Sequence, residues 1–375
     1  MHSWRPVPAL VASAALLLLA CSHGEPFGPV DHSSSDPFEP AIVPLRLTYG
    51  GGQRPAWLDA DHLIYSFSDG QDQCLGILPA TGGRRTRTIC NASPFQSDTV
   101  DLHDESAPEP GTDRVAFVRA RLQPATGSGL HTIVVGPLDS LPSGTVLQSA
   151  VFASSEGFMQ QIGLLRWLAP GTLAFLGADD GIFTPCDTCQ PVVIRRWKSA
   201  FSLAAPDQPP SAPLTAVPIP DTRFATSLAP GATADQIFVT YANDSRLVLK
   251  PLGGGGGTVV ATFDAASTPR DADYANGRVA VIAGGKIGHF TDDNGDPAQG
   301  FDEGGELQIV NVASGAVTPL PSATLLFRRP RWSPDGTSLL AEGYAYQVVT
   351  VSGPFGPALD TVVSAVSDIY RIQVP

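Results

Sequence analysis

Charged residues are scarce in this 375-residue sequence: Asp, Glu, Lys and Arg make up 16% of it, while 43% of the residues are hydrophobic. This composition excludes a chain that is disordered throughout, because such chains combine low hydrophobicity with high charge. Basic residues are fewer than acidic ones, 23 against 36, so the formal net charge is −13 at pH 7. An acidic chain repels a phosphate backbone, and we therefore expect no nucleic-acid partner.

The sequence also lacks the common catalytic motifs. It contains no GxSxG, HExxH or GxxxxGK[ST] and no GxGxxG after a predicted strand, so the usual nucleophile, zinc and phosphate sites are absent. The glycine run at residues 253–257 has no Lys and no helix after it, and it is predicted to be a hairpin tip. The histidines are scattered, and the segment His103-Asp104-Glu105 is interpreted as a solvated loop rather than as a general acid or metal ligand.

Glycine and proline are abundant, with 38 and 35 residues. Together they make up about a fifth of the chain, which favours many short strands joined by turns over long helices. The predicted fold class is therefore all-β.

The amino terminus is predicted to be a targeting segment. Arg5 precedes an apolar stretch at residues 9–20, which is too short to span a bilayer as a helix. The run Leu18-Leu19-Ala20-Cys21 resembles the lipobox of bacterial lipoproteins, with an ordinary secretory signal as the alternative. The resemblance implies that Cys21 is lipidated, and Ser22 in place of Asp implies sorting to the outer membrane. We thus expect a signal peptide at residues 1–20 and a Pro- and Ser-rich, lipid-anchored tether at 21–43.

From residue 44 onward one pattern recurs: a strand, a tight turn and a second strand. Its clearest copy occupies residues 331–341, where Trp332 precedes a Pro-Asp-Gly turn that ends at Gly336. This copy resembles the WxPDG repeat of TolB-like, WD40-like propellers. Weaker copies lie at residues 56–65, 108–117, 166–175, 228–239 and 274–281.

Six copies predict a six-bladed β-propeller over residues 44–375, with a β-sandwich or two stacked β domains as the alternative. The last repeat ends with a third strand at residues 368–374 and has no fourth strand behind it. The segment 44–50 resembles the missing outer strand. We therefore predict that the N-terminal strand pairs in the last blade and closes the ring.

Four cysteines remain after Cys21, and three pairings are open to them. Cys74 and Cys90 flank one predicted hairpin, which favours a disulfide between them. Cys186 and Cys189 form a CxxC in a Pro-flanked insertion, where a structural bridge is favoured over a redox centre or half of a metal site.

An acidic segment follows the fifth repeat copy. Asp292, Asn294, Asp296 and Glu303 have the spacing of Ca²⁺ ligands, but Pro297 stands where such loops need Gly. A solvated hairpin insertion is favoured over a calcium loop, because Asp, Asn and Gly are also ordinary turn residues. We expect no other cofactor.

Basic residues recur at or just before the predicted innermost strands. These residues are Arg54, Arg166, Arg223, Arg270 and Arg331, with His103 near the corresponding place in the second repeat. In a propeller the innermost strands line the central channel, so the guanidinium groups could converge into an anion site. The alternative is that each Arg pairs with an acid such as Asp271, Asp273 or Asp335 and ties blades together.

Two functions follow from these patterns. The resemblance to TolB-like propellers implies a non-catalytic envelope lipoprotein that binds or scaffolds a protein or peptide partner. The second hypothesis is a propeller hydrolase or lyase that acts on an anionic peptide or glycan at the channel. No nucleophile can be paired with a base in the sequence, so the binding role is preferred.

Overall fold

The apolar stretches of the sequence form antiparallel strands that are buried on both faces. In β3 (His62–Asp69) five consecutive residues are buried, and in β15 (Gln236–Tyr241) four are. A strand of this kind needs protein on both sides of its sheet, so the sheets must pack face to face with neighbours. The computed structural model describes residues 42–69, 72–90, 100–123, 128–141, 145–153, 162–183, 192–205, 214–242, 244–264, 267–285, 287–291, 297–302, 304–353 and 356–375.

The strands pair in order into four-stranded sheets, here called blades and numbered along the chain. Blade 1 consists of β2 (Gln53–Trp57), β3, β4 (Asp72–Pro79) and β5 (Arg87–Ile89). Blade 2 consists of β6 (Val100–Pro108), β7 (Arg114–Gln123), β8 (Ser128–Pro137) and β9 (Thr145–Ala153), with a short 3-10 helix at Leu138–Ser140. Blade 3 consists of β10 (Ile162–Ala169), β11 (Thr172–Phe183), β12 (Val192–Ala204) and β13 (Val217–Pro218).

The second half of the chain repeats this order with insertions. Blade 4 consists of β14 (Ala225–Pro230), β15, β16 (Arg246–Pro251) and β17 (Thr258–Thr262). Blade 5 consists of β18 (Arg270–Ala275), β19 (Arg278–Ala283), β22 (Glu306–Asn311) and β23 (Val317–Leu320), with the hairpin β20 (Ile287–Thr291) and β21 (Pro297–Asp302) inserted. Blade 6 consists of β24 (Leu325–Trp332), β25 (Ser338–Gly353), β27 (Asp368–Gln373) and β1 (Leu45–Arg46), while β26 (Gly356–Val363) pairs with the far half of β25.

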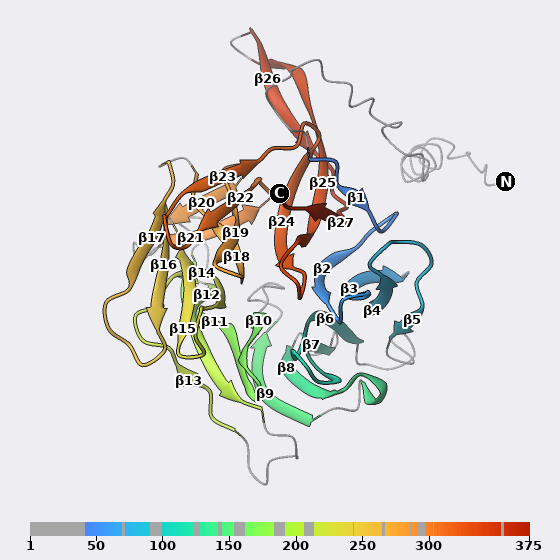
Figure 1. The fold of residues 1–375 in the computed structure, drawn as a ribbon, viewed down its shortest axis with the longest axis vertical. Coiled ribbons are helices and arrows are strands. Elements are labelled where there is room, and N and C mark those ends of the chain that lie inside the picture. The colour runs from blue at the N-terminus through green and yellow to red at the C-terminus, as the bar shows by residue number, and fades with distance from the viewer. Residues whose placement is uncertain are drawn as a thin grey trace, which may run out of the picture. The chain divides into compact units, whose positions relative to one another are not determined.

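The six blades are arranged in a ring around a central hub, with the first strand of each blade innermost (Figure 1). Residues 42–375 fold as a six-bladed β-propeller. Each of the six predicted repeat copies coincides with the junction between the first and second strands of a blade. Within the described residues, no helix has the length and apolar character needed to cross a bilayer.

The N-terminal strand closes the ring, as predicted. Leu45 and Arg46 of β1 pair with Arg371 and Tyr370 of β27, which makes β1 the outer strand of blade 6. Side chains reinforce the pairing, because Arg46 Nη2 lies 2.6 Å from Asp368 Oδ2 and the Thr48 hydroxyl donates to Asp368 Oδ1 at 3.0 Å. The first and last segments of the propeller are therefore joined in one sheet.

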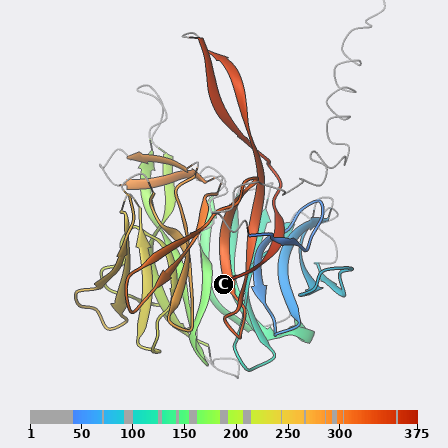
Figure 2. The same ribbon diagram turned by 45° about the horizontal axis from the view of Figure 1, so that its top comes forward.

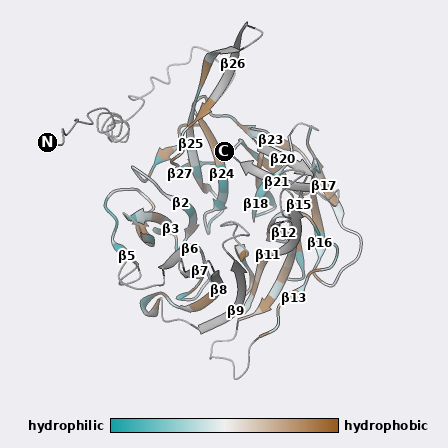
Figure 3. Cartoon of the chain, turned by 180° about the vertical axis from the view of Figure 1, so that it is seen from behind, coloured by the Kyte–Doolittle hydropathy of each residue, from teal (hydrophilic) through white to brown (hydrophobic). Residues whose placement is uncertain are grey.

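The hydrophobic core consists of six layers between neighbouring blades rather than one central mass. The layer between blades 1 and 2, for example, joins Ile64 and Leu75 to Phe117 and Val134, all of which are fully buried. Apolar residues recur along strands in every part of the ring (Figure 3). Because each layer needs both of its blades, no blade buries its apolar faces alone.

The Pro-Asp-Gly turn between β24 and β25 shows why this motif marks a repeat. The Gly336 N–H donates to the Ser333 carbonyl at 2.8 Å, and the Asp335 carboxylate accepts the Thr337 N–H at 3.0 Å. Gly336 has φ +69°, and a Cβ there would lie 2.4 Å from Asn276 Nδ2 of blade 5. Both the backbone conformation and the contact between blades therefore require glycine.

Three tryptophans clamp neighbouring blades. The indole N–H groups of Trp57, Trp167 and Trp332 donate to the carbonyls of Arg331, Ala107 and Asp273, each in the preceding blade. An arginine of that preceding blade lies over each indole ring and also donates to a carbonyl of the tryptophan's blade. The three pairs are Arg371 over Trp57, Arg114 over Trp167 and Arg278 over Trp332. These clamps join blades 6 and 1, 2 and 3, and 5 and 6.

Three elaborations in the described part of the ring lie in connections between second and third strands. In blade 3 the β11–β12 hairpin continues past the end of β10, in blade 5 the β20–β21 hairpin is inserted, and in blade 6 the β25–β26 arm is inserted. Because the strands of every blade alternate in direction, all of these connections emerge on one face of the ring. Figure 2 shows the β25–β26 arm and the β20–β21 hairpin on the same side.

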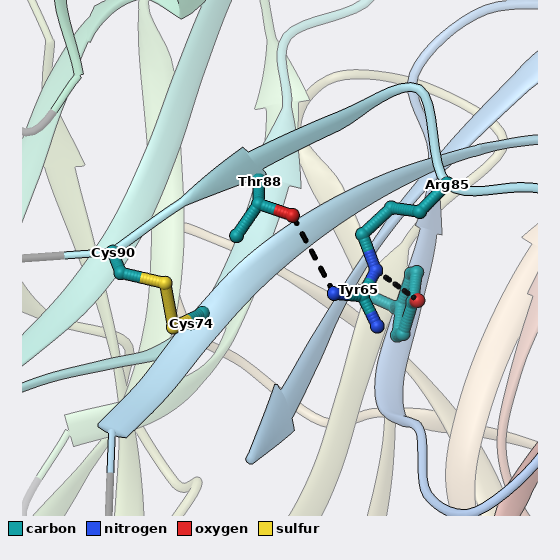
Figure 4. Close-up of a disulfide and its surroundings, with 5 residues drawn as sticks. All are labelled: Tyr65, Cys74, Arg85, Thr88 and Cys90. Carbon is teal, nitrogen blue, oxygen red and sulfur yellow. Dashed lines mark hydrogen bonds between the residues drawn. A yellow bond between two sulfur atoms is a disulfide. The ribbon is translucent and has the colours of Figure 1, made fainter. Parts of the chain in front are cut away.

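A disulfide pins the short outer strand of blade 1, as predicted. Cys74 in β4 is bonded to Cys90, which directly follows the three-residue strand β5, and the Cα atoms lie 4.6 Å apart (Figure 4). Arg85 supports the same connection, because its Nε donates to the Tyr65 hydroxyl at 2.9 Å and its guanidinium lies 3.5 Å from the centre of the Phe67 ring. β5 pairs with β4 over only three residues, and pairing this short would hold the strand weakly without the disulfide.

We expect the double variant Cys74→Ala/Cys90→Ala to lose about 3 kcal/mol of unfolding free energy, since the bond closes a short loop in the unfolded chain. The measurement is urea unfolding of the wild type and the variant without reductant. The Cys186→Ala/Cys189→Ala variant, which removes the other predicted bridge, is measured beside it for comparison. Identical unfolding midpoints for the wild type and Cys74→Ala/Cys90→Ala would contradict a stabilising role for this bond.

Candidate functional site

The innermost strands are irregular at equivalent places. In each of the six blades the register between the first and second strands shifts at a bulge. Four non-glycine residues at these bulges have left-handed backbones, namely Arg54, Leu164, Asp271 and Arg329, with φ between 50° and 54°. A bulge redirects side chains, and here it directs polar groups towards the hub.

Nine charged residues form what we call the hub cluster. They come from blades 1, 2, 3, 5 and 6, and their charged groups lie mostly out of solvent. The members are Arg54, Glu105, Arg166, Asp271, Asp273, Arg328, Arg329, Arg331 and Glu342.

Acidic side chains of the hub cluster bind the bulges of the following blade. Glu105 accepts the N–H of Leu164 at 2.5 Å, Asp271 accepts that of Arg329 at 3.1 Å, and Glu342 accepts that of Arg54 at 2.5 Å. In blade 4 the Ser227 hydroxyl takes this place and accepts the Ala272 N–H at 3.1 Å. Each bond satisfies a backbone donor that the bulge removes from the strand ladder.

Two arginines share one carboxylate near the centre. Arg166 Nη1 lies 3.4 Å and Arg331 Nη2 lies 3.7 Å from Glu105 Oε1, and Arg166 Nε lies 3.8 Å from Asp273 Oδ1. Asp273 in turn accepts the N–H of Trp332 at 2.7 Å. Ion pairs among these side chains therefore connect blades 2, 3, 5 and 6.

Glu342 is the most deeply buried acid of the cluster, with no exposed surface. Arg329 Nη1 donates to its Oε1 at 2.8 Å, and the Tyr344 hydroxyl donates to its Oε2 at 3.0 Å. Burial favours the neutral acid, but Arg329 and Arg328 outweigh it and lower the Glu342 pKa to about 2. The carboxylate is therefore ionised at any physiological pH.

Positive charge is crowded in the hub. Burial, followed by the neighbouring Arg329, lowers the pKa of Arg54 to about 9, and burial with Arg166 lowers that of Arg331 to about 10. Burial also raises the pKa of Asp273, although Arg331 and Arg166 oppose it. Arg54 and Arg331 nevertheless remain cationic at neutral pH. The acids between the arginines offset the repulsion among them.

The arginines predicted to line the channel have three different environments. Arg54, Arg166 and Arg331 belong to the hub cluster. Arg270 is 2% exposed, but its Nη1 donates to the Gly284 carbonyl at 2.9 Å within blade 5. Arg223 is exposed over the Phe224 ring, beside the outer strands of blade 4. Arg166 and Arg331 lie near Glu105 of blade 2, as in the alternative in which acids and arginines tie blades together. Anion binding by the arginines stays a prediction.

The solvated loop predicted for His103-Asp104-Glu105 is wrong. All three residues belong to β6, and Glu105 is 2% exposed. The polar sequence reflects the hub, where the carboxylate of Glu105 meets arginines of two other blades. For His103 the structure describes only the backbone.

Several predicted sites lie outside the described residues. They are the lipidation site Cys21, the pair Cys186 and Cys189, and the cation ligands Asp292, Asn294, Asp296 and Glu303. Among the residues that are described, no group of three or more His, Cys, Asp and Glu side chains is arranged to hold a metal ion.

Four hub residues were not predicted from the sequence, namely Glu105, Glu342, Arg328 and Arg329. Glu342 carried a usable signal, because it is a single acid within the apolar run of β25, and an isolated charge in a buried strand needs a partner. Arg328 and Arg329 also lie in an apolar strand, directly before the strongest repeat motif. Their partners come from other blades, so no local spacing links them.

Comparisons with known proteins give similarity of structure only. No family model matches the sequence, and no curated protein sequence matches it. Among solved structures, TolB from Acinetobacter baumannii is 12% identical with a TM-score of 0.45, and the match covers 85% of this chain and 65% of that one. The chain thus spans just under two thirds of the length of TolB. The WD40 domain of Toxoplasma gondii coronin is 10% identical with a TM-score of 0.41, over 89% of this chain and 88% of that one.

Proposed function

We propose that the protein is a non-catalytic binding module of the bacterial cell envelope, held to the outer membrane through a lipid on Cys21. The face that carries the hairpins of blades 3, 5 and 6 would hold a protein or peptide partner. The observation that carries this proposal is that, within the described residues, the hairpins of blades 3, 5 and 6 all lie on one face. On the opposite face the turns between first and second strands are short, and those of blades 3 and 5 span only two residues each.

The β25–β26 arm has the character of a contact surface. It is a two-stranded hairpin that extends beyond the blade, and Val348 and Val362 on it are 58% and 47% exposed. Such a hairpin is marginally stable in water by itself, and its exposed apolar side chains favour contact with another molecule.

Two features support the envelope as the location. The lipobox-like run ends at Cys21, and acyl chains on a cysteine add about 0.8 kcal/mol per buried CH₂ to membrane binding. The Cys74–Cys90 disulfide suits an oxidising compartment outside the cytoplasm.

The hydrolase or lyase alternative finds no support in the hub. Catalysis of this kind needs a nucleophile or a general base free to meet a substrate. The described acids Glu105, Asp271 and Glu342 each accept a backbone N–H from the next blade and lie near arginines. These three carboxylates connect neighbouring blades and are already occupied by these contacts.

Photo-crosslinking in intact cells tests the proposal. A photoreactive amino acid replaces Val348 or Val362 on the arm, and Ala232 or Ala234 in the β14–β15 turn of the opposite face serves as the matched control. We expect one or a few discrete adducts from the arm positions and none from the control positions. Equal crosslinking from both faces, or none from either, would refute the hairpin face as the binding surface.

The anchor is tested in the same cells. The wild-type protein should sediment with outer membranes, and the Cys21→Ser variant should not. Sedimentation of Cys21→Ser with the membranes would overturn lipid anchoring. It would not affect the conclusion about the binding face, which the crosslinking experiment tests separately.

A further inference from the structure

Two guanidinium groups from opposite sides of the ring meet in the hub. Arg166 lies in β10 of blade 3 and Arg331 in β24 of blade 6, and in a ring of six these blades face each other across the centre (Figure 1). Their end nitrogens nevertheless lie 3.4 and 3.7 Å from the same oxygen, Oε1 of Glu105. The two side chains are only 7% and 9% exposed. Two cations are therefore held close together out of solvent.

The acids beside these two arginines make their shortest bonds to backbone groups. Glu105 accepts the Leu164 N–H through its other oxygen, Oε2. Asp273 likewise accepts the Trp332 N–H through Oδ2 at 2.7 Å. The described contacts from these acids to the two arginines are longer, at 3.4, 3.7 and 3.8 Å, whereas charge-assisted hydrogen bonds are about 2.7–2.9 Å long. The carboxylates thus neutralise this pair of arginines incompletely.

Arg166 also has buried donors that no described group accepts. Its Nη1 donates to the Leu165 carbonyl at 2.6 Å, but its Nε and Nη2 are buried and have no hydrogen-bond partner among the described residues. Buried N–H groups are almost always hydrogen-bonded, whether to protein, to ordered water or to an ion. The remaining donors of Arg166 therefore indicate a further acceptor in the hub.

Arg329 is a closely paired arginine of the same hub cluster and provides a contrast. Its Nη1 donates to Glu342 Oε1 at 2.8 Å. Burial lowers the pKa of Arg329, but Glu342 and Asp271 outweigh burial and raise it. For Arg331, burial and then the nearby Arg166 lower the pKa to about 10. Additional negative charge would therefore be favourable beside Arg331 and Arg166.

We propose that the hub binds a small monovalent anion, of the size of chloride, between Arg166 and Arg331. The guanidinium groups donate hydrogen bonds to the ion, and its charge offsets the repulsion between the two cations. Water accepts the same donors but carries no charge that offsets this repulsion. A small ion also suits side chains that are less than a tenth exposed, which a peptide carboxylate reaches poorly.

The ion would add to the stability of the closed ring, because it connects two opposite blades. The site is separate from the hairpin face of the proposed function. It narrows the anion site expected from the sequence to two of its arginines.

Urea unfolding of the full chain in matched salts tests the site. An ion that binds only the folded chain stabilises it by mass action, so a site half-occupied at about 15 mM chloride raises the folding equilibrium constant about 10-fold in about 150 mM chloride. We expect the wild type to unfold at a higher urea concentration in sodium chloride than in sodium gluconate of equal ionic strength. The Arg166→Met variant should lose this difference. Arg87→Met, which removes a partly exposed arginine of β5, is the matched control and should keep it.

Anomalous X-ray scattering from wild-type crystals grown in sodium bromide locates the ion and needs no variant, so the test holds even if Arg166→Met does not fold. Bromide has the charge of chloride and nearly its size, and it should give an anomalous peak in contact with the guanidinium groups of Arg166 and Arg331. Ordered water at this place without anomalous signal would overturn the inference. Bromide peaks at exposed surface arginines alone would indicate an adventitious ion only and would overturn it too. So would equal stability of the wild type in the two salts, or an undiminished response to chloride in Arg166→Met.

Discussion

A chain that begins at Gln53 is expected to unfold at least about 10 °C below a chain that begins at Ile42, because it lacks the strand that closes the ring. The missing segment removes Leu47, which is 2% exposed in the layer between blades 6 and 1. It also leaves Asp368 without Arg46 and Thr48, although its side chain is only 10% exposed. Losing a buried leucine and the partners of a buried acid together costs about 5 kcal/mol.

Differential scanning calorimetry of the two chains measures this effect. A synthetic peptide of residues 42–52, added to the shortened chain, should raise its unfolding temperature again. The same peptide with Leu47 replaced by Asp is the control and should have no effect. Equal unfolding temperatures for the two chains would show that pairing of β1 in blade 6 does not stabilise the propeller.

Replacing Glu342 by Gln is expected to cost about 3–5 kcal/mol of unfolding free energy, the range found when one partner of a buried ion pair is removed. Three donors converge on this carboxylate: the Arg54 N–H, the Arg329 guanidinium and the Tyr344 hydroxyl. The variant leaves the Arg329 guanidinium, which is 13% exposed, without its closest acid. Urea unfolding at neutral pH measures the change. Glu306→Gln, the same substitution at a half-buried residue of β22, should unfold nearly as the wild type does.

The contribution of Glu342 should disappear in acid. Its pKa is about 2 in the folded protein and 4.5 as the ordinary value of a glutamate, so folding favours the ionised form. A lowered folded pKa stabilises the protein fully above the unfolded value, and this stabilisation is lost as the pH falls towards 2. The difference in stability between the wild type and Glu342→Gln should therefore shrink between pH 5 and pH 2. A difference that stays constant over this range would contradict the ion pair as its cause.

The parts of the structure that the sequence predicted are those encoded locally. The turn at Asp335 and Gly336 identifies a blade because a few adjacent residues determine its conformation. Closure of the ring was predictable because the segment 44–50 resembles an outer strand of the repeat, and in the structure β1 pairs with β27. The Cys74–Cys90 bond was predictable because one hairpin brings its two halves together.

The hub was not predictable in the same way, because its partners meet only when distant blades come together. Glu105 and Arg331 are separated by most of the ring's sequence, yet their charged groups lie 3.7 Å apart. The polar segment around Glu105 therefore has the composition of a loop, although it is a buried strand.

The three tryptophan clamps are distributed unevenly around the ring. The chain contains five tryptophans, and the two outside the clamps are Trp4 near the amino terminus and Trp197 in the long hairpin of blade 3. Among the described side chains, the layers on both sides of blade 4 contain aliphatic residues, phenylalanine and tyrosine but no tryptophan. Blade 4 takes part in none of the three clamps. We therefore expect its amide hydrogens to exchange with solvent before those of blade 6.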